Sequence, residues 1–223
     1  MRSHFIPIRS MTRADLIRNQ IFTIENILSP AECAEYIELT ENIGYAPAPI
    51  TTVRGFQMRP DIRNNERVIL DDLERAANLW QRVSAYIPEK IGRWRAIGLN
   101  ERFRFYRYDP GQKFALHHDG SYRRANGEES LLTFMIYLNQ GFAGGETRFY
   151  VGTRHPLYLK KTDNLNVPCP YDDDNSEISV VPVTGMALCF IHDLPHEGAS
   201  VLQGRKYVLR SDVMYSDRTP SSN

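Results

Sequence analysis

A short segment in the second half of the chain carries a histidine and a carboxylate at a spacing that suits one metal ion. In the segment 114–120 (FALHHDG), His117 and Asp119 are two residues apart. On an extended backbone such residues point to the same side, whereas His118 points away. A second histidine, His196, follows 77 positions after Asp119. Two histidines and one carboxylate on one face of an octahedron are typical of oxygen-activating ferrous sites and leave three coordination positions open.

The His-x-Asp spacing alone is a weak signal, because a chain with six histidines and many acidic residues produces it by chance. Loop residues that bond to the backbone would explain it as well. The helical His-Glu-x-x-His motif of zinc hydrolases is absent from the sequence. Ten residues after His196, Lys206 opens an alternating segment. Facing inward, this lysine would pair with the far carboxylate of a bound dicarboxylate; otherwise it is a solvated strand end.

Two helices are predicted in the first part of the chain. Residues 21–26 (IFTIEN) alternate like a short strand, and Ser29, Pro30 and Glu32 then form a capping box that predicts a helix through Thr40. A second helix is predicted over 71–86, where apolar residues form one stripe. Residues 45–67 are rich in Pro, Thr and Arg and are predicted to be irregular.

Short strands dominate from about residue 97, and Pro- and Gly-containing turns separate them. Strands are predicted at 101–108, 131–139, 146–151, 177–182, 187–192 and 206–215. Helices followed by a run of strands predict a mainly β fold with flanking helices (α+β), a jelly roll buttressed by N-terminal helices. The order of elements argues against an alternating α/β fold.

The chain reads as one domain with four regions. These are a flexible N-terminal arm (1–20), a helical support region (21–95), a jelly-roll core that carries the site (96–217) and a flexible tail (218–223). The segment 152–176 lacks periodicity and is predicted to be a functional or disordered loop, whose acidic run at 172–174 is a solvated turn rather than a calcium loop.

Composition favours a soluble cytoplasmic protein. Basic and acidic residues number 27 each, so no net field attracts nucleic acid or an anionic membrane. The three cysteines are far apart and indicate neither a disulfide framework nor a zinc ribbon. No apolar run approaches the roughly 20 residues that span a bilayer, and residues 1–20 lack the apolar core of a secretory signal.

Several motifs occur in a fixed order: Tyr108-x-x-Gly111, His117-x-Asp119, Tyr137-Leu-Asn139, Gly144-Gly-x-Thr147, Pro182-x-x-Gly185, His196 and Lys206. Together they resemble the catalytic domain of the prolyl 4-hydroxylase-like 2-oxoglutarate/Fe(II)-dependent dioxygenases. The resemblance covers about residues 20–217, is strongest over 102–215, and implies a double-stranded β-helix with helices packed outside. It identifies the superfamily far better than the substrate.

By position, the resemblance implies that His117, Asp119 and His196 bind iron and that Lys206 binds the far carboxylate of 2-oxoglutarate. Tyr137 matches a tyrosine that hydrogen-bonds this carboxylate in some relatives, but a core aromatic residue is an equal alternative. Tyr108 matches a residue near the oxoacid or the substrate, and simple burial of its ring is the alternative. The implied cofactors are Fe(II), 2-oxoglutarate and O2, and a need for ascorbate is left open.

The implied activity is hydroxylation of an unactivated C–H bond with release of succinate and CO2. The retained Asp119 favours hydroxylation, because halogenating relatives replace this carboxylate with a small residue. A prolyl or other peptidyl residue is the first candidate substrate; a free amino acid or natural-product intermediate is the alternative. A distant alternative to an enzyme is a non-catalytic jelly-roll binding module.

The sequence gives little further indication of the substrate. Nucleic acid is not expected, because Arg205 and Arg210 are five positions apart, where nucleic-acid demethylases of the superfamily carry two arginines six apart. Arg210 shares a strand face with Lys206 and would meet an acidic substrate or pair with Asp212. Arg63 and Arg67 lie where relatives often build the substrate groove.

Overall fold

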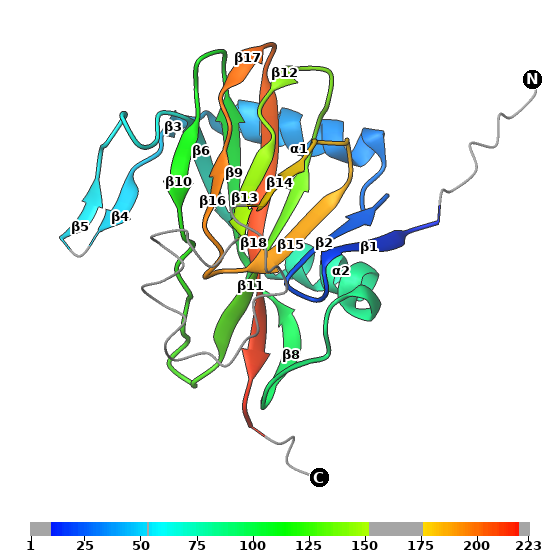
Figure 1. Ribbon diagram of the computed structural model, residues 1–223. Helices are drawn as coiled ribbons and strands as arrows, with labels where there is room; N and C mark the ends of the chain where they lie inside the picture. Colours follow the sequence, from blue (N-terminus) through cyan, green and yellow to red (C-terminus); the bar gives the residue numbers. More distant parts are fainter. Residues whose placement is uncertain (1–9, 53, 152–175, 219–223) are drawn as a thin grey trace, which may run out of the picture.

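Two large antiparallel sheets, two small two-stranded ribbons and two α-helices make up the computed structural model, which describes residues 10–52, 54–151 and 176–218 (Figure 1). The main sheet runs in the order β1-β2-β15-β11-β18-β9-β6-β3, and β8, which pairs with β7, joins the end of β18. The predicted mainly β fold is therefore confirmed. The strands of this sheet are β1 (Thr12–Ile17), β2 (Ile21–Glu25), β3 (Ala46–Pro47), β6 (Glu66–Asp71), β7 (Lys90–Ile91), β8 (Trp94–Leu99), β9 (Arg102–Tyr108), β11 (Glu129–Tyr137), β15 (Ala187–Ile191) and β18 (Lys206–Ser216).

The second sheet has the order β10-β16-β13-β14 and lies across one face of the first (Figure 1). Its strands are β10 (Phe114–His117), β13 (Thr147–Val151), β14 (Ser176–Val180) and β16 (His196–Gly198). Two small ribbons complete the fold, β4 (Ile50–Thr52) with β5 (Gly55–Gln57) and β12 (Ala143–Gly144) with β17 (Val201–Gln203). The hairpin β4–β5 projects from the body of the protein (Figure 1).

Helices α1 (Pro30–Ile43) and α2 (Leu73–Val83) cover the other face of the main sheet, and a short 3-10 turn (Ser84–Tyr86) follows α2. The predicted capping box is present, because the Ser29 hydroxyl accepts from the Glu32 amide and the Glu32 carboxylate accepts from the Ser29 amide. At α2 the Asp72 carboxylate accepts from the Arg75 amide as the N-cap. The first helix thus begins where the sequence predicts, and the second begins two residues after the predicted start at residue 71.

The alternation of β9 divides the core between the two faces of the main sheet. Phe103 and Phe105 are fully buried on the helix side, whereas Tyr106 and Tyr108 belong to a second apolar cluster between the two sheets. Fixing the register of β9 therefore decides which side chains face the helices and which face the space between the sheets.

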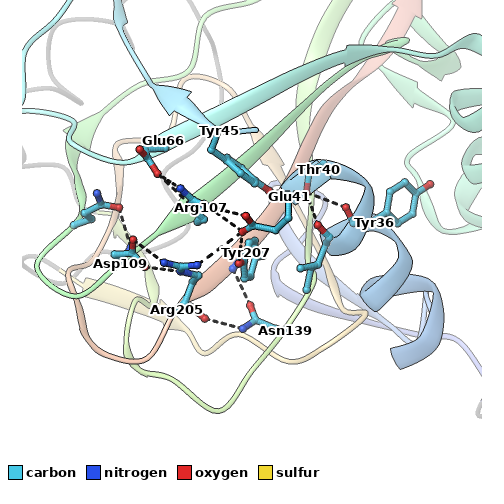
Figure 2. A network of polar contacts seen from close by, with 12 residues as sticks. Tyr36, Thr40, Glu41, Tyr45, Glu66, Arg107, Asp109, Asn139, Arg205 and Tyr207 are labelled. Carbon is cyan, nitrogen blue, oxygen red and sulfur yellow. Dashed lines mark hydrogen bonds and ion pairs between the residues drawn. The ribbon is translucent and has the colours of Figure 1, made fainter. Parts of the chain in front are cut away.

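A polar network on the helix side ties α1 to the sheet (Figure 2). The Glu41 carboxylate of α1 accepts from the Arg107 guanidinium at 2.8 Å and from the Tyr207 hydroxyl at 2.5 Å. Arg107 also donates to Glu66 of β6 at 2.5 Å. Arg107 and Tyr207 are neighbours on β9 and β18, so the network holds the helix against the two strands that carry Tyr108 and Lys206 on their opposite face.

Three predictions about the first half of the chain need correction. Residues 10–20 are not a flexible arm, because Thr12–Ile17 pairs with β2 as an edge strand whose mostly exposed side chains hide the usual apolar alternation. Residues 45–67 contain β3, β4, β5 and the start of β6, short strands held by backbone pairing rather than burial. The helical support region 21–95 accordingly supplies strands as well as both helices.

Two predicted segments lie outside the described residues, namely nearly all of the loop 152–176 and the tail beyond residue 218. Among the residues that are described, no helix is both long and apolar enough to cross a membrane.

Among the described glycines, Gly185 leaves the least room for a side chain. Its φ is +78°, and an added Cβ would lie 2.0 Å from the Leu28 carbonyl oxygen, next to the bond that the Ile27 amide donates to the Gly185 carbonyl. We expect Gly185→Ala to lower the free energy of unfolding by about 2–4 kcal/mol, since it combines left-handed backbone strain with a backbone clash.

Thermal unfolding measures this effect, and Gly98→Ala is the matched control, because a Cβ at Gly98 meets nothing within 4 Å. Equal melting temperatures for the two variants would contradict the assigned packing.

Candidate active site

The three predicted metal ligands come together between the two sheets. His117 ends β10, His196 begins β16, and the two residues are paired in the register of these strands. Asp119 follows β10, and one donor atom from each of the three side chains lies within 4.8 Å of the others. The Nε2 atoms of His117 and His196 are 3.7 Å and 3.6 Å from the two carboxylate oxygens of Asp119.

Hydrogen bonds fix which ring nitrogen of each histidine is free. Nδ1 of His117 lies 2.8 Å from the Ala115 carbonyl oxygen, and Nδ1 of His196 lies 2.8 Å from the Leu194 carbonyl oxygen. A carbonyl only accepts, so each Nδ1 carries the proton and each Nε2 keeps its lone pair for a metal. Burial lowers the pKa of His117 to about 3 and also lowers the pKa of His196, so both rings are neutral.

His118 points away from this cluster, as the alternation predicts. Its Nδ1 lies 2.6 Å from the carbonyl oxygen of Asp193.

Asp119 is 7 % exposed and is held at both oxygens. The Thr133 hydroxyl donates to Oδ2 at 2.6 Å, and the Arg210 guanidinium contacts Oδ1 at 2.8 Å. Burial acts to raise the pKa of Asp119, but Arg210, the two histidines and Thr133 together hold it below its usual value. The carboxylate therefore stays charged, and with two neutral imidazoles it fits Fe(II).

Thr133 is itself positioned by a buried chain of polar groups that the sequence did not reveal. Because its hydroxyl proton goes to Asp119, its oxygen accepts from Nδ1 of His192, 2.9 Å away. Nε2 of His192 then accepts from the Ser130 hydroxyl at 2.9 Å. Ser130 and Thr133 lie on β11, and the registers of β11 with β15 and β18 bring them beside His192 and Asp212.

Lys206 opens β18 and is 2 % exposed, which excludes the alternative of a solvated strand end. Its Nζ donates to the Gly145 carbonyl oxygen at 2.6 Å and forms no ion pair with a carboxylate of the described residues. Burial lowers the pKa of Lys206 to about 7, against a raising effect of Glu146. A buried amine of this kind fits an incoming carboxylate.

Tyr108 and Tyr137 lie on either side of Lys206, with ring centroids 5.2 Å and 5.5 Å from its Nζ. A narrow pocket contains the three metal ligands and Lys206, and Tyr108 lines it as well. The Tyr137 hydroxyl donates to Thr147 at 2.7 Å, and Thr147, not Tyr137, lines the pocket. Burial raises the pKa of Tyr108 to about 12, so its phenol is neutral.

The sequence matches the family described as the 2OG-Fe(II) oxygenase superfamily over residues 103–211, a stretch that includes all three metal ligands and Lys206. This part of the chain belongs to the superfamily. Its residues fit the two groups that the superfamily uses, Fe(II) and the cosubstrate 2-oxoglutarate: His117, Asp119 and His196 would hold the metal.

Solved structures of prolyl hydroxylases share the fold of this oxygenase. A prolyl hydroxylase from Trichoplax adhaerens, in complex with a hypoxia inducible factor peptide fragment, has a TM-score of 0.60 and 16% identity, with 92% of this chain and 88% of that chain covered. A Pseudomonas putida prolyl-4-hydroxylase has a TM-score of 0.57 and 19% identity, with 86% and 91% covered.

A viral collagen prolyl hydroxylase from Paramecium Bursaria Chlorella virus-1 has a TM-score of 0.53 and 20% identity, with 87% and 95% covered. No curated protein matches the sequence significantly. These likenesses confirm the predicted double-stranded β-helix.

Thr133→Val tests whether the buried chain positions Asp119. Valine keeps the shape but removes the donor to Oδ2 and leaves Nδ1 of His192 without an acceptor. We expect the dissociation constant for Fe(II), measured anaerobically, to rise about 10- to 100-fold. Thr133→Ser keeps the hydroxyl and should stay close to wild type. Unchanged Fe(II) affinity in the valine variant would show that Thr133 does not position the ligand.

Proposed function

We propose that this oxygenase hydroxylates an unactivated C–H bond and releases succinate and CO2. The observation that carries the proposal is the complete ligand set, in which Asp119 is retained and held at both oxygens. The bound metal and cosubstrate supply the oxidation: dioxygen gives one oxygen atom to succinate and one to the substrate carbon as 2-oxoglutarate is decarboxylated.

Lys206 is proposed to bind the far carboxylate of 2-oxoglutarate. The Lys206 Nζ is buried and lies in the same pocket as the ligands, and among the described residues it bonds only to the Gly145 carbonyl. The Thr147 hydroxyl accepts from Tyr137 and keeps its own proton to donate to this carboxylate. Tyr137 then acts through Thr147, and Tyr108 forms the wall beside it.

A prolyl or other peptidyl residue remains the first candidate substrate. The three prolyl hydroxylases share the fold, and the projecting hairpin β4–β5 carries Phe56, a residue that is 73% exposed and available to contact an extended peptide. A free amino acid or natural-product intermediate is the second candidate, and the narrow, charged pocket favours it. A non-catalytic binding module would not need neutral histidines with free Nε2 atoms.

We also infer a reducing, cytoplasmic setting. Cys33 and Cys189 are buried free thiols, as in proteins of such compartments.

Succinate formation and oxygen uptake with Fe(II) and 2-oxoglutarate test the reaction class. Even without substrate, we expect slow turnover in the wild type and its loss in His117→Ala, Asp119→Ala and His196→Ala, because each change removes a ligand. Lys206→Ala should raise the 2-oxoglutarate concentration for half-maximal rate by at least about tenfold. If ligand variants kept the wild-type rate, the assigned metal site would be wrong.

The pH dependence of 2-oxoglutarate binding tests Lys206 separately. Its pKa of about 7 means that the amine is charged below pH 7 and neutral above it. A carboxylate prefers the charged form, so above pH 7 binding must take up a proton. We expect the dissociation constant, measured anaerobically with Fe(II), to rise up to about tenfold per pH unit above 7.

Lys206→Arg is the matched control, because a guanidinium stays charged and should flatten this dependence. A wild-type profile as flat as that of the arginine variant would contradict the assignment.

A further inference from the structure

Four arginines lie on the side of the main sheet that carries the metal site, and we call Arg63, Arg67, Arg104 and Arg210 the arginine patch. Paired residues of neighbouring strands point to the same side, and the registers place Arg67 beside Tyr106 and Arg104 beside Arg210. Tyr106 and Arg210 both line the pocket, so Arg67 and Arg104 lie on the same face of the sheet as the pocket, opposite the helices.

Arg63 joins the row from the segment before β6. Its guanidinium carbon lies 4.5 Å from the ring centroid of Tyr106 and 4.4 Å from that of Phe114. The Phe114 ring in turn stacks on His117, with centroids 3.5 Å apart. Arg63 is therefore one aromatic ring away from a metal ligand.

Only two carboxylates balance these four positive charges. Arg210 contacts Asp119 and, at 3.4 Å, Asp212, and Arg104 contacts Asp212 at 3.2 Å. Arg63 and Arg67 form no ion pair with any acidic residue of the described chain. The patch thus keeps an excess of two positive charges beside the pocket.

Two of the four arginines also have a buried nitrogen without a hydrogen-bond acceptor. Arg63 is 5% exposed, its Nε donates to Asn65, and its Nη2 is buried without an acceptor. Nε of Arg210 is also buried without an acceptor. Buried donors are nearly always bonded, because an unmet one costs free energy. Consistent with a positive field, Tyr106 has a lowered pKa: burial acts to raise it, but Arg63, Arg210 and Arg104 outweigh this.

Fe(II) and 2-oxoglutarate do not remove the excess. A ferrous ion carries two positive charges and 2-oxoglutarate carries two negative ones, so together they add no net charge. The far carboxylate of 2-oxoglutarate is, moreover, already paired with Lys206. The anion that completes the patch must then arrive with the substrate.

We propose that the substrate carries a carboxylate, which Arg63 and Arg67 bind beside the metal site. This inference rests on the proposed function and narrows its substrate class. The carboxylate belongs either to a free amino acid or related small acid, or to an acidic side chain of a peptide. In both cases the arginines orient the C–H bond through the charged end of the substrate.

The first experiment compares matched probes on the wild-type enzyme loaded with Fe(II) and 2-oxoglutarate. The panel consists of free amino acids with their carboxamides, and of proline-containing peptides with glutamate or glutamine at one position. Succinate formation above the substrate-free rate, and probe binding under anaerobic conditions, are the readouts. We expect at least one carboxylate probe to stimulate turnover about tenfold more than its amide partner. Whether an amino acid or a peptide stimulates turnover then shows which of the two kinds of substrate carries the carboxylate.

Variants of the arginine patch test whether it causes the preference for the carboxylate probe over the amide probe. Arg67→Gln should raise KM for the carboxylate probe about tenfold toward that of the amide, whereas Arg67→Lys should retain part of the discrimination. Arg63→Lys keeps the charge but loses the planar stack between two rings, and Arg63→Gln loses both. A larger KM defect in Arg63→Gln than in Arg63→Lys therefore reports charge rather than packing.

Arg93→Gln is the control for the loss of one arginine, because the Arg93 side chain is 75% exposed and pairs with Asp217 at the C-terminal end of β18.

Equal stimulation by carboxylate and amide probes would overturn the inference, and so would failure of every carboxylate probe to bind or stimulate. Loss of discrimination in Arg93→Gln as well would equally overturn it. These outcomes differ from failure of the proposed function, which would appear in the wild type as absence of 2-oxoglutarate binding and of succinate formation.

Discussion

The site depends on keeping one carboxylate charged inside the protein. Asp119 is almost completely buried, and an unpaired carboxylate in such a place would protonate and lose its value as a metal ligand. Arg210 and Thr133 prevent this by satisfying one oxygen each. The Thr133 oxygen in turn accepts from His192, which accepts from Ser130, so a buried chain of hydrogen bonds orients the donor to Asp119.

The fold supplies these partners from strands that are distant in sequence. β10 and β16 of the small sheet bring the two histidines together, and β11 and β18 of the main sheet bring Thr133 and Arg210. The helices do not reach the site. They cover the opposite face, where the Glu41 network fixes the strand that ends in Tyr108 and the strand that begins with Lys206 (Figure 2). The Glu41 network and the residues of the site thus lie on opposite faces of one sheet.

Much of this arrangement could be predicted from local sequence signals. Alternation placed His117 and Asp119 on one side and His118 on the other, and the capping box at Ser29 located α1. The edge strand β1 was missed because its pairing involves the backbone and leaves most side chains exposed. The contact of Arg210 with Asp119 joins residues 91 positions apart, and periodicity indicated only the shared face. His192 carried no motif at all, since its role follows from the register of β11 with β15.

The central claim is that a metal and 2-oxoglutarate bind together between the two sheets. Calorimetric titration of 2-oxoglutarate into the protein under anaerobic conditions, with and without Fe(II), tests it most directly. The account predicts one 2-oxoglutarate bound per chain in the presence of Fe(II) and markedly weaker binding when the metal is omitted or when His196 is replaced by alanine. No binding in the presence of Fe(II), or binding of equal strength without it, would contradict the account.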